Sequence, residues 1–393
     1  MDRIIYLDNH ATTQVDPRVL ESMRPFMEED FANASSRSHR AGLRAAEAVE
    51  AARAQVGALI GAPAADIVFT SGATEANNTA LKGLWETMRG KACHLITQAT
   101  EHSSVLATVG YLEKQGVRVT VLPVDEHGLV SPLDVREAVT DETFLISVML
   151  ANNEVGTLQP AAEIGKIAKE KGVFFHADAA QAAGKIPIDV ESLGIDLLSW
   201  TAHKMYGPKG VGALYIRRKN PHVRIQPLLH GGEQEKGLRS GTLNVPGIAG
   251  FGRASEIAAC EMPSESRRVQ ALRDKLEKGL RRLDFVRLNG HSTERLSGNL
   301  NLSFAGVEAG AVLAEIQNEI ALSASSACSS GSTEPSHVLK AMKVPREYLY
   351  QALRFGLGRF TTEEDVRFTL ERMTDIIQQH RRISPFYPPQ KSN

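Results

Sequence analysis

The sequence contains little cysteine and no surplus of either charge. Its 393 residues include three cysteines, and the 45 Lys and Arg residues nearly balance the 46 Asp and Glu residues. Three scattered cysteines without a C-x-x-C pair exclude a disulfide framework and a zinc-binding cysteine pair, and they favour a reducing cytoplasm. A chain without a basic stripe is not expected to bind DNA or a membrane surface directly. We therefore expect a cytoplasmic protein with no resident metal ion.

Long hydrophobic stretches and nucleotide-binding glycine motifs are also missing. The longest apolar stretch, at about 144–151, is far shorter than the roughly 20 residues of a membrane span. The N-terminal residues do not have the pattern of a secretory signal. The chain has neither G-x-x-x-x-G-K-[ST] nor a strand-linked G-x-G-x-x-G, which argues against a nucleotide site. We expect a protein without a membrane segment.

The sequence does contain a series of short apolar, β-branched segments separated by stretches with helical spacing. Such alternation predicts an α/β fold with a mostly parallel seven-stranded sheet that is covered on both faces. In such a sheet, ligands bind beyond the carboxyl ends of the strands. The predicted strands are 67–70, 93–97, 117–122, 144–150, 172–178, 196–200 and 212–216.

The pattern changes near residue 255, where a long charged helix is expected to begin. Its apolar positions recur every three or four residues, which is typical of a helix with one buried face. We predict a large domain over residues 15–255 and a smaller α/β domain built from residues 1–14 and 256–393. The apolar face consists of Val269, Leu272, Leu276, Leu280 and Leu283.

Two charged residues follow neighbouring strands at positions where a charge needs a partner. Lys204 comes just after the strand 196–200, where desolvation can turn its amine into a Schiff-base nucleophile, although a solvated surface lysine is the simpler interpretation. Asp178 ends the strand 172–178. It can pair there with a pyridinium nitrogen, or it can cap the following helix.

Other strand ends carry further candidates for ligand contacts. The turn SGATEANN can cradle a phosphate with the hydroxyl of Thr74 and free backbone N–H groups, or Ser71 and Thr74 can form an ordinary capping box. His102 can stack on a flat cofactor ring or be a structural histidine. Asn152 and Asn153 follow the strand 144–150 and can be simple turn residues.

Cys328 lies in ALSASSACSSGSTEP, a run of small residues that gives a thiol access and freedom to move. Cys93, at the head of a strand, and Cys260, on a helical stretch, are expected to be unreactive core or surface thiols. Arg354 lies between apolar residues on a predicted strand. Its guanidinium is suited to a bidentate clamp on a substrate carboxylate, and an internal salt bridge is the alternative.

Taken together, these motifs resemble the cysteine desulfurases of the class V aminotransferase group, which have the fold-type I pyridoxal-phosphate architecture. The resemblance covers nearly the whole chain, from YLDNHATT to RFGLGRFTTEED. It includes SGATEANN, TEHSS, NNEVG, HADAAQ, HKMYGPKGVG, RSGTLN and SSACSSGSTEPSHVL in the order of the family. The long form of the segment at about 324–337 resembles the first group of the family, which serves iron–sulfur cluster assembly and tRNA thiolation.

The resemblance implies a set of contacts to pyridoxal 5'-phosphate. Lys204 is expected to form the Schiff base, His102 to stack on the ring, Asp178 to pair with the ring nitrogen and Gln181 to bond the phenolic oxygen. The residues expected to hold the phosphate are Thr74, Thr201, His203 and, from the neighbouring subunit of a homodimer, Thr242.

The resemblance also implies a substrate and an acceptor. Asn153 and Arg354 are expected to bind the carboxylate of L-cysteine, with Lys204, His102 and Cys328 as the catalytic residues. Cys328 is expected to take the sulfur as a persulfide, releasing L-alanine, and to pass it to an iron–sulfur scaffold protein or another sulfur acceptor, with only a transient cluster contact.

Two departures from the family pattern are visible. Ala34 stands where proline is commoner, and Ala76-Asn77 where Ser-Asp is frequent; neither is expected to touch a catalytic atom. Two other functions remain open at this point. The chain can be an ordinary class V aminotransferase or selenocysteine lyase with an incidental Cys328, or a non-catalytic sulfur-trafficking scaffold.

Overall fold

The computed structural model describes residues 4–324 and 334–388, and its centre is a seven-stranded sheet. All seven predicted strands are present, and the α/β prediction is confirmed. The strand order is β2-β8-β7-β6-β5-β3-β4, and β8 is the one antiparallel member. The strands are β2 (Ile67–Thr70), β3 (His94–Gln98), β4 (Arg118–Leu122), β5 (Thr143–Ser147), β6 (Phe174–Asp178), β7 (Leu197–Thr201) and β8 (Gly212–Ile216).

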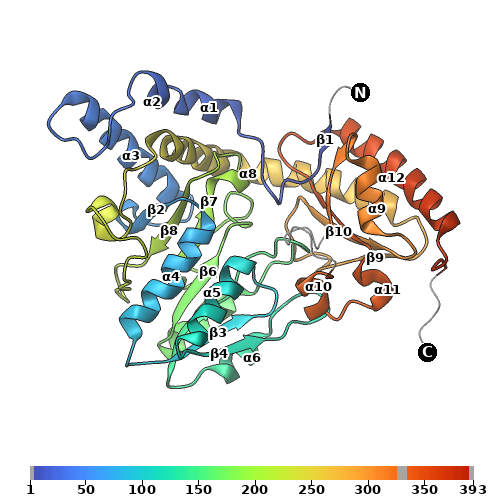
Figure 1. Cartoon of the computed structure of the whole chain (residues 1–393), viewed down its shortest axis with the longest axis horizontal. Helices are drawn as coiled ribbons and strands as arrows, with labels where there is room; N and C mark the ends of the chain where they lie inside the picture. The colour runs from blue at the N-terminus through green and yellow to red at the C-terminus, as the bar shows by residue number, and fades with distance from the viewer. Residues whose placement is uncertain (1–3, 325–333, 389–393) are drawn as a thin grey trace.

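Helices cover both faces of this sheet (Figure 1). One face packs against α4 (Ala73–Met88) and α5 (Ser103–Lys114). The other packs against α1 (Pro17–Met23), α3 (Arg40–Ala58), α7 (Ala161–Lys171) and the first half of α8 (Val245–Leu280). Because side chains alternate across a strand, each strand contributes to both cores, which explains its continuous apolar sequence. The shorter helices are α2 (Pro25–Glu28) and α6 (Pro132–Ala138).

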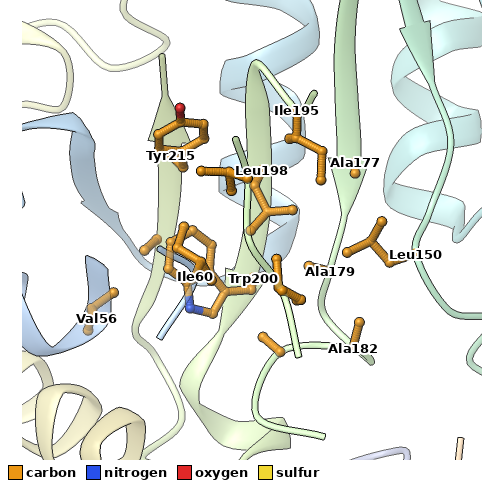
Figure 2. Close-up of a cluster of buried hydrophobic side chains, with 14 of the residues drawn as sticks. Val56, Ile60, Leu150, Ala177, Ala179, Ala182, Ile195, Leu198, Trp200 and Tyr215 are labelled. Carbon is orange, nitrogen blue, oxygen red and sulfur yellow. The ribbon is translucent and has the colours of Figure 1, made fainter. Parts of the chain in front are cut away.

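Figure 2 shows the larger of the two cores close up. Trp200 on β7 is fully buried in the same cluster as Leu198 of that strand, and its ring meets the ring of Phe251 of α8 edge to face, with the centroids 6.1 Å apart. Val56 and Ile60 approach this cluster from α3 and the turn that follows it. Burying large side chains on β7 holds the end of that strand rigidly, and Lys204 follows three residues later.

A second, smaller layer lies at one end of the molecule (Figure 1). It combines the antiparallel sheet β12-β13-β10-β9 with the pair β1-β11, and α8, α9 and α12 pack on it. Helix α8 begins at Val245, where Asn244 caps it, which is ten residues before the predicted change in pattern. The helix ends at Leu280, so Leu283, which was predicted to lie on its apolar face, falls outside it. It contributes to both cores, and the domain boundaries stay a prediction. The remaining elements are β1 (Ile5–Tyr6), β9 (Val286–Leu288), β10 (Asn299–Phe304), α9 (Ala309–Ile316), β11 (Ile320–Ala321), β12 (Ser323–Ala324), α10 (His337–Ala341), α11 (Arg346–Leu349), β13 (Ala352–Gly356) and α12 (Glu363–Ile383). No helix in the described ranges has both the length and the apolar character needed to cross a membrane.

Gly165 of α7 allows the helix to approach the turn between β6 and β7. A Cβ atom on Gly165 would lie 1.9 Å from the backbone oxygen of Leu193. We expect Gly165→Ala to lower the free energy of unfolding by about 1–3 kcal/mol, because backbone atoms cannot move aside as a side chain can. Gly110→Ala in α5 is the matched control, since no atom lies within 4 Å of its Cβ position. It should raise stability by about 0.5–1 kcal/mol in the same urea denaturation experiment, and equal effects at the two sites would contradict this packing.

Candidate active site

A cavity of about 730 Å³ lies at the carboxyl edge of the seven-stranded sheet. Strands β2, β3, β5, β6 and β7 point toward this edge, and the N-terminal segment and β13 close the cavity from the second layer. The structure brings together most of the predicted site residues there. Those that line the cavity are Thr74, His102, Asn153, Asp178, Gln181, Thr201, His203, Lys204 and Arg354.

One end of the cavity is the start of helix α4. The N-cap residue is Gly72, and no side chain caps the helix, so the alternative of a capping box formed by Ser71 and Thr74 is wrong. The N–H of Ser71 is instead held by the carboxylate of Glu75, at 2.8 Å. The first N–H groups of a helix have no partner within the helix. Together with the Thr74 hydroxyl at the cavity wall, they are suited to an anionic ligand group.

The cavity wall continues through the end of β7 to the residue before Lys204. Thr201 is buried and donates to the backbone oxygen of Val211, at 3.2 Å. His203 Nδ1 lies 3.1 Å from the hydroxyl of Thr12. Burial, with the positive charge of Lys204, lowers the pKa of His203 to about 4, so its ring is neutral at pH 7. Lys204 ends the short 3-10 turn that follows β7 and lines the cavity, as predicted.

Asp178 is the last residue of β6 and is buried. One carboxylate oxygen accepts from the side-chain amide of Asn77, at 2.7 Å, and the other from the backbone N–H of Ala180, at 2.8 Å. The hydrogen bond from Ala180 spans two residues of the turn after β6, so Asp178 satisfies a local backbone N–H there, much as a helix cap does. Within residues 4–324 and 334–388, however, Asp178 forms no salt bridge. A buried carboxylate without a cation is costly, so this oxygen pair is suited to a cationic ligand group.

The imidazole of His102 is tied to the same network. Its Nδ1 accepts from the backbone N–H of Ser104, at 3.1 Å, and lies 2.8 Å from the Ser104 hydroxyl. That hydroxyl accepts in turn from Asn77, at 2.9 Å. Burial is the main cause that lowers the pKa of His102, and the charge of Lys204 adds to it against the opposing effect of Asp178. The ring is therefore a neutral base at pH 7, with its proton on Nε2.

Asn77 corrects one expectation from the sequence. The departure at Ala76-Asn77 was expected to touch no catalytic atom, but the fully buried Asn77 bonds both Asp178 and Ser104. The signal was available in the sequence: Asn77 lies between Ala76 and Ala80 on the apolar stripe of α4, where a polar side chain needs a buried partner. An amide here donates to Asp178, whereas a carboxylate would repel it.

Arg354 lies on β13 and reaches the cavity from the second layer. Its guanidinium donates to the carboxylate of Asp8, at 2.8 Å, and to the backbone oxygen of Asn153, at 2.9 Å. The internal salt bridge considered as the alternative therefore exists. Nε of Arg354 has no hydrogen-bond partner among the described residues, and the side chain still lines the cavity. Asn152 is the turn residue of the pair, because its side chain binds three backbone groups, whereas Asn153 faces the cavity.

Two predicted site residues are not in the cavity wall. Thr242 is exposed outside it, and its predicted contact with a neighbouring subunit stays a prediction. Cys328 lies outside the described residues. Of the other cysteines, Cys93 is half-buried and packs against the core beneath α4, and Cys260 is exposed on α8.

Glu101, to which no sequence motif pointed, is a fully buried carboxyl group next to this network. It accepts from the backbone N–H of Met149, at 2.6 Å, and from the side chain of Gln98, at 3.1 Å. Burial and the charge of Asp178 raise the pKa of Glu101 to about 8. Glu101 is therefore mostly protonated at pH 7.

This shift predicts a pH dependence of stability. Because the pKa of Glu101 rises from 4.5 to about 8 on folding, its protonated form contributes stability below pH 4.5 that is lost as the pH rises toward 8. As the pH rises over that interval, the free energy of unfolding of the wild type should fall relative to that of Glu101→Gln, by up to about 1.4 kcal/mol per pH unit. Chemical denaturation at half-unit pH steps measures the difference, and parallel curves from pH 5 to 8 would contradict the shift.

Comparisons with known proteins agree with this geometry. Residues 5–368 match the family model described as aminotransferase class-V. The chain is 52% identical over 384 residues to the cysteine desulfurase IscS of Anaeromyxobacter sp. (strain Fw109-5), with 98% of this chain and 95% of that protein covered. It is 49% identical over 384 residues to the cysteine desulfurase IscS of Rickettsia conorii (strain ATCC VR-613 / Malish 7), with 98% and 93% covered.

Solved structures give the same result. A NifS-like protein is similar with a TM-score of 0.90 and 40% identity, over 96% of this chain and 100% of that one. SspA in complex with cysteine is similar with a TM-score of 0.80 and 39% identity, over 91% of this chain and 100% of that one. The chain therefore belongs to the aminotransferase class-V family and, within it, to the cysteine desulfurases whose motifs its sequence contains.

Proposed function

We propose that this protein is a pyridoxal-phosphate-dependent cysteine desulfurase. It converts L-cysteine to L-alanine and places the sulfur on Cys328 as a persulfide, for delivery to iron–sulfur cluster assembly or tRNA thiolation acceptors. The observation that carries the proposal is the meeting of an amine at Lys204, an unpaired buried carboxylate at Asp178 and a neutral imidazole at His102 around one cavity. The names of the relatives support the same reaction.

The cavity fits pyridoxal 5'-phosphate. Its volume of about 730 Å³ is within the usual range for a cofactor site. The uncapped start of α4 with Thr74, and Thr201 and His203 beside it, would hold the phosphate. Asp178, which has no cationic partner in the described chain, would pair with the pyridinium nitrogen, and Gln181 would bond the phenolic oxygen. When bound, the cofactor supplies an electron sink for the carbanion at the substrate Cα.

The side chains of the chain itself bind the substrate and move its protons. Arg354 and Asn153 would hold the substrate carboxylate, and Asp8 fixes the guanidinium in place. The amine of Lys204 would remove the Cα proton. His102, neutral at pH 7 with its proton on Nε2, would donate that hydrogen toward the substrate, and its ring orientation is set by Ser104.

The transfer of sulfur from L-cysteine to Cys328 needs no further oxidant or reductant. The Cys328 thiolate attacks the substrate sulfur, so that an S–S bond forms and the C–S bond breaks. The electron pair of the broken bond goes to the carbon fragment, which takes up a proton and leaves as L-alanine. Cys328 is left as the persulfide, and the next acceptor thiol removes its outer sulfur.

The protein is proposed to act as a homodimer. Thr242 lies exposed outside its own cavity, on the segment after Arg239, whose guanidinium binds Glu75 of helix α4, at 2.9 Å. A second subunit would receive Thr242 at its phosphate site. The large cavity of about 1020 Å³ between α3 and residues 233–236 gives the partner a concave surface nearby.

The direct test is to add L-cysteine to the purified yellow protein and measure products. L-Alanine should appear, and mass spectrometry should find one extra sulfur atom on the peptide that contains Cys328. Transfer of the amino group to a keto acid, or turnover of selenocysteine alone, would indicate an aminotransferase or a selenocysteine lyase instead. A colourless protein that does not take up pyridoxal phosphate would indicate a non-catalytic scaffold.

A further inference from the structure

A network of hydrogen bonds joins His10, Gln181 and Lys185 at the cavity wall, and neither His10 nor Lys185 has a role in the proposed function. His10 and Gln181 are each at most 3% exposed, and both line the cavity. The side-chain nitrogen of Gln181 donates to the backbone oxygen of His10, at 2.9 Å. Its side-chain oxygen lies 3.1 Å from Lys185 Nζ and 3.1 Å from His10 Nδ1. One glutamine amide is thus held from three directions.

These contacts determine the orientation of the amide. A backbone oxygen can only accept, so the Gln181 atom that faces it is the NH₂ group. The oxygen of Gln181 must then receive hydrogen bonds from both Lys185 and His10. Both lone pairs of that oxygen are used, and the second N–H of Gln181 forms no hydrogen bond in the described part of the chain.

The same argument determines the tautomer of His10. Since the oxygen of Gln181 accepts, His10 Nδ1 carries the hydrogen. Burial, with the positive charges of Lys185 and Arg354, holds the pKa of His10 well below its usual value, so the ring is neutral. Its Nε2 is then an unprotonated nitrogen, and it is buried without a hydrogen-bond partner in the described residues.

We propose that Lys185 and His10 are positioning residues that lock the Gln181 amide with an N–H turned toward an oxygen of the bound ligand. This proposal rests on the proposed function, in which that oxygen is the phenolic oxygen of the cofactor. Without the lysine and the histidine, a glutamine amide can rotate by half a turn and present its oxygen, which repels an anionic oxygen. Lys185 is a suitable partner because its amine donates to the Gln181 oxygen, at 3.1 Å, and burial with the charges of Lys204 and Arg354 lowers its pKa to about 7.

The first test reads the tautomer of His10 in the purified holoenzyme. In protein with ¹⁵N-labelled histidine, the His10 signals, assigned with His10→Asn, should show a protonated Nδ1 and an unprotonated Nε2 at pH 8. Protonation on Nε2 would mean that Gln181 has the opposite orientation and would overturn the proposal. This measurement needs no variant of Lys185 and does not depend on turnover.

The second test is a double-mutant cycle on cofactor affinity. Lys185→Met should weaken pyridoxal phosphate binding by about 2- to 10-fold, the usual effect of one hydrogen bond, whereas Lys166→Met, on the exposed face of α7, should not. In a Gln181→Met background the Lys185→Met change should have no further effect. An undiminished effect there would show that Lys185 acts directly through its charge. Lys185→Arg, which keeps a donor, should restore most of the affinity.

The outcomes separate this proposal from the proposed function. A wild-type protein that binds no pyridoxal phosphate would remove the proposed function. A wild-type protein that binds it normally, with a His10 proton on Nε2 or an additive cycle, would remove only the role of Lys185 and His10.

Discussion

Lys204→Ala is expected to lose turnover by about 10³-fold or more and to lose the borohydride-reducible link to pyridoxal phosphate. The amine of Lys204 is proposed both to hold the cofactor covalently and to move the Cα proton, so its removal is expected to abolish both roles at once. Absorbance of the purified variant and mass spectrometry after borohydride treatment measure the link. The 3-10 turn after β7 positions this residue at the cavity.

Lys209 is the matched control for this prediction, because it lines the same cavity without following a buried strand end. Lys209→Ala should keep the borohydride-trapped link, and the trapped mass should lie on the peptide that contains Lys204. A link trapped at Lys209 or Lys185 in the wild type would mean that the wrong amine has been assigned.

Cys328→Ser is expected to keep the cofactor spectrum and to lose the formation of L-alanine and persulfide from L-cysteine. A hydroxyl is far less nucleophilic toward sulfur than a thiolate, so the C–S bond of the bound substrate stays intact. Product analysis by mass spectrometry, with the absorbance recorded in the same sample, separates loss of chemistry from loss of the cofactor.

Cys93→Ser and Cys260→Ser are the controls for the thiol. Cys93 is half-buried beside the core beneath α4, and Cys260 is exposed on α8, so neither is expected to receive sulfur from the cavity. Both variants should form L-alanine at the wild-type rate. Full alanine production by Cys328→Ser, or its loss in Cys260→Ser, would contradict the proposed acceptor.

The polar groups around Asp178 carry no positive or negative charge of their own at pH 7. Asn77 contributes an amide where a second carboxylate would raise the energy, and Glu101 is held in its protonated form by burial and by Asp178 itself. His176, two residues before Asp178 on β6, is buried between Ser147 and Ser199, and burial lowers its pKa to about 4. With neutral neighbours, the Asp178 carboxyl group is left without a cationic partner among the described residues, which suits it to a cationic ligand group.

The sequence by itself determined the strands, their common edge and most of the site. Buried parallel strands need continuous apolar segments, and the residues after them must meet at one edge of the sheet. Lys204, Asp178 and His102 could therefore be brought together from their positions after predicted strands. Arg354 was found by the same logic, because an arginine among apolar residues needs an anionic partner.

Only the tertiary structure decided which polar groups face each other. Asn77, Ser104 and Asp178 are far apart in the chain, and so are His10, Gln181 and Lys185. Side-chain hydrogen bonds depend on distances of a few ångströms and on rotamers, which packing between layers sets and which local patterns do not encode. The protonation of Glu101 depends in the same way on burial by surrounding elements, and no sequence neighbour reveals it.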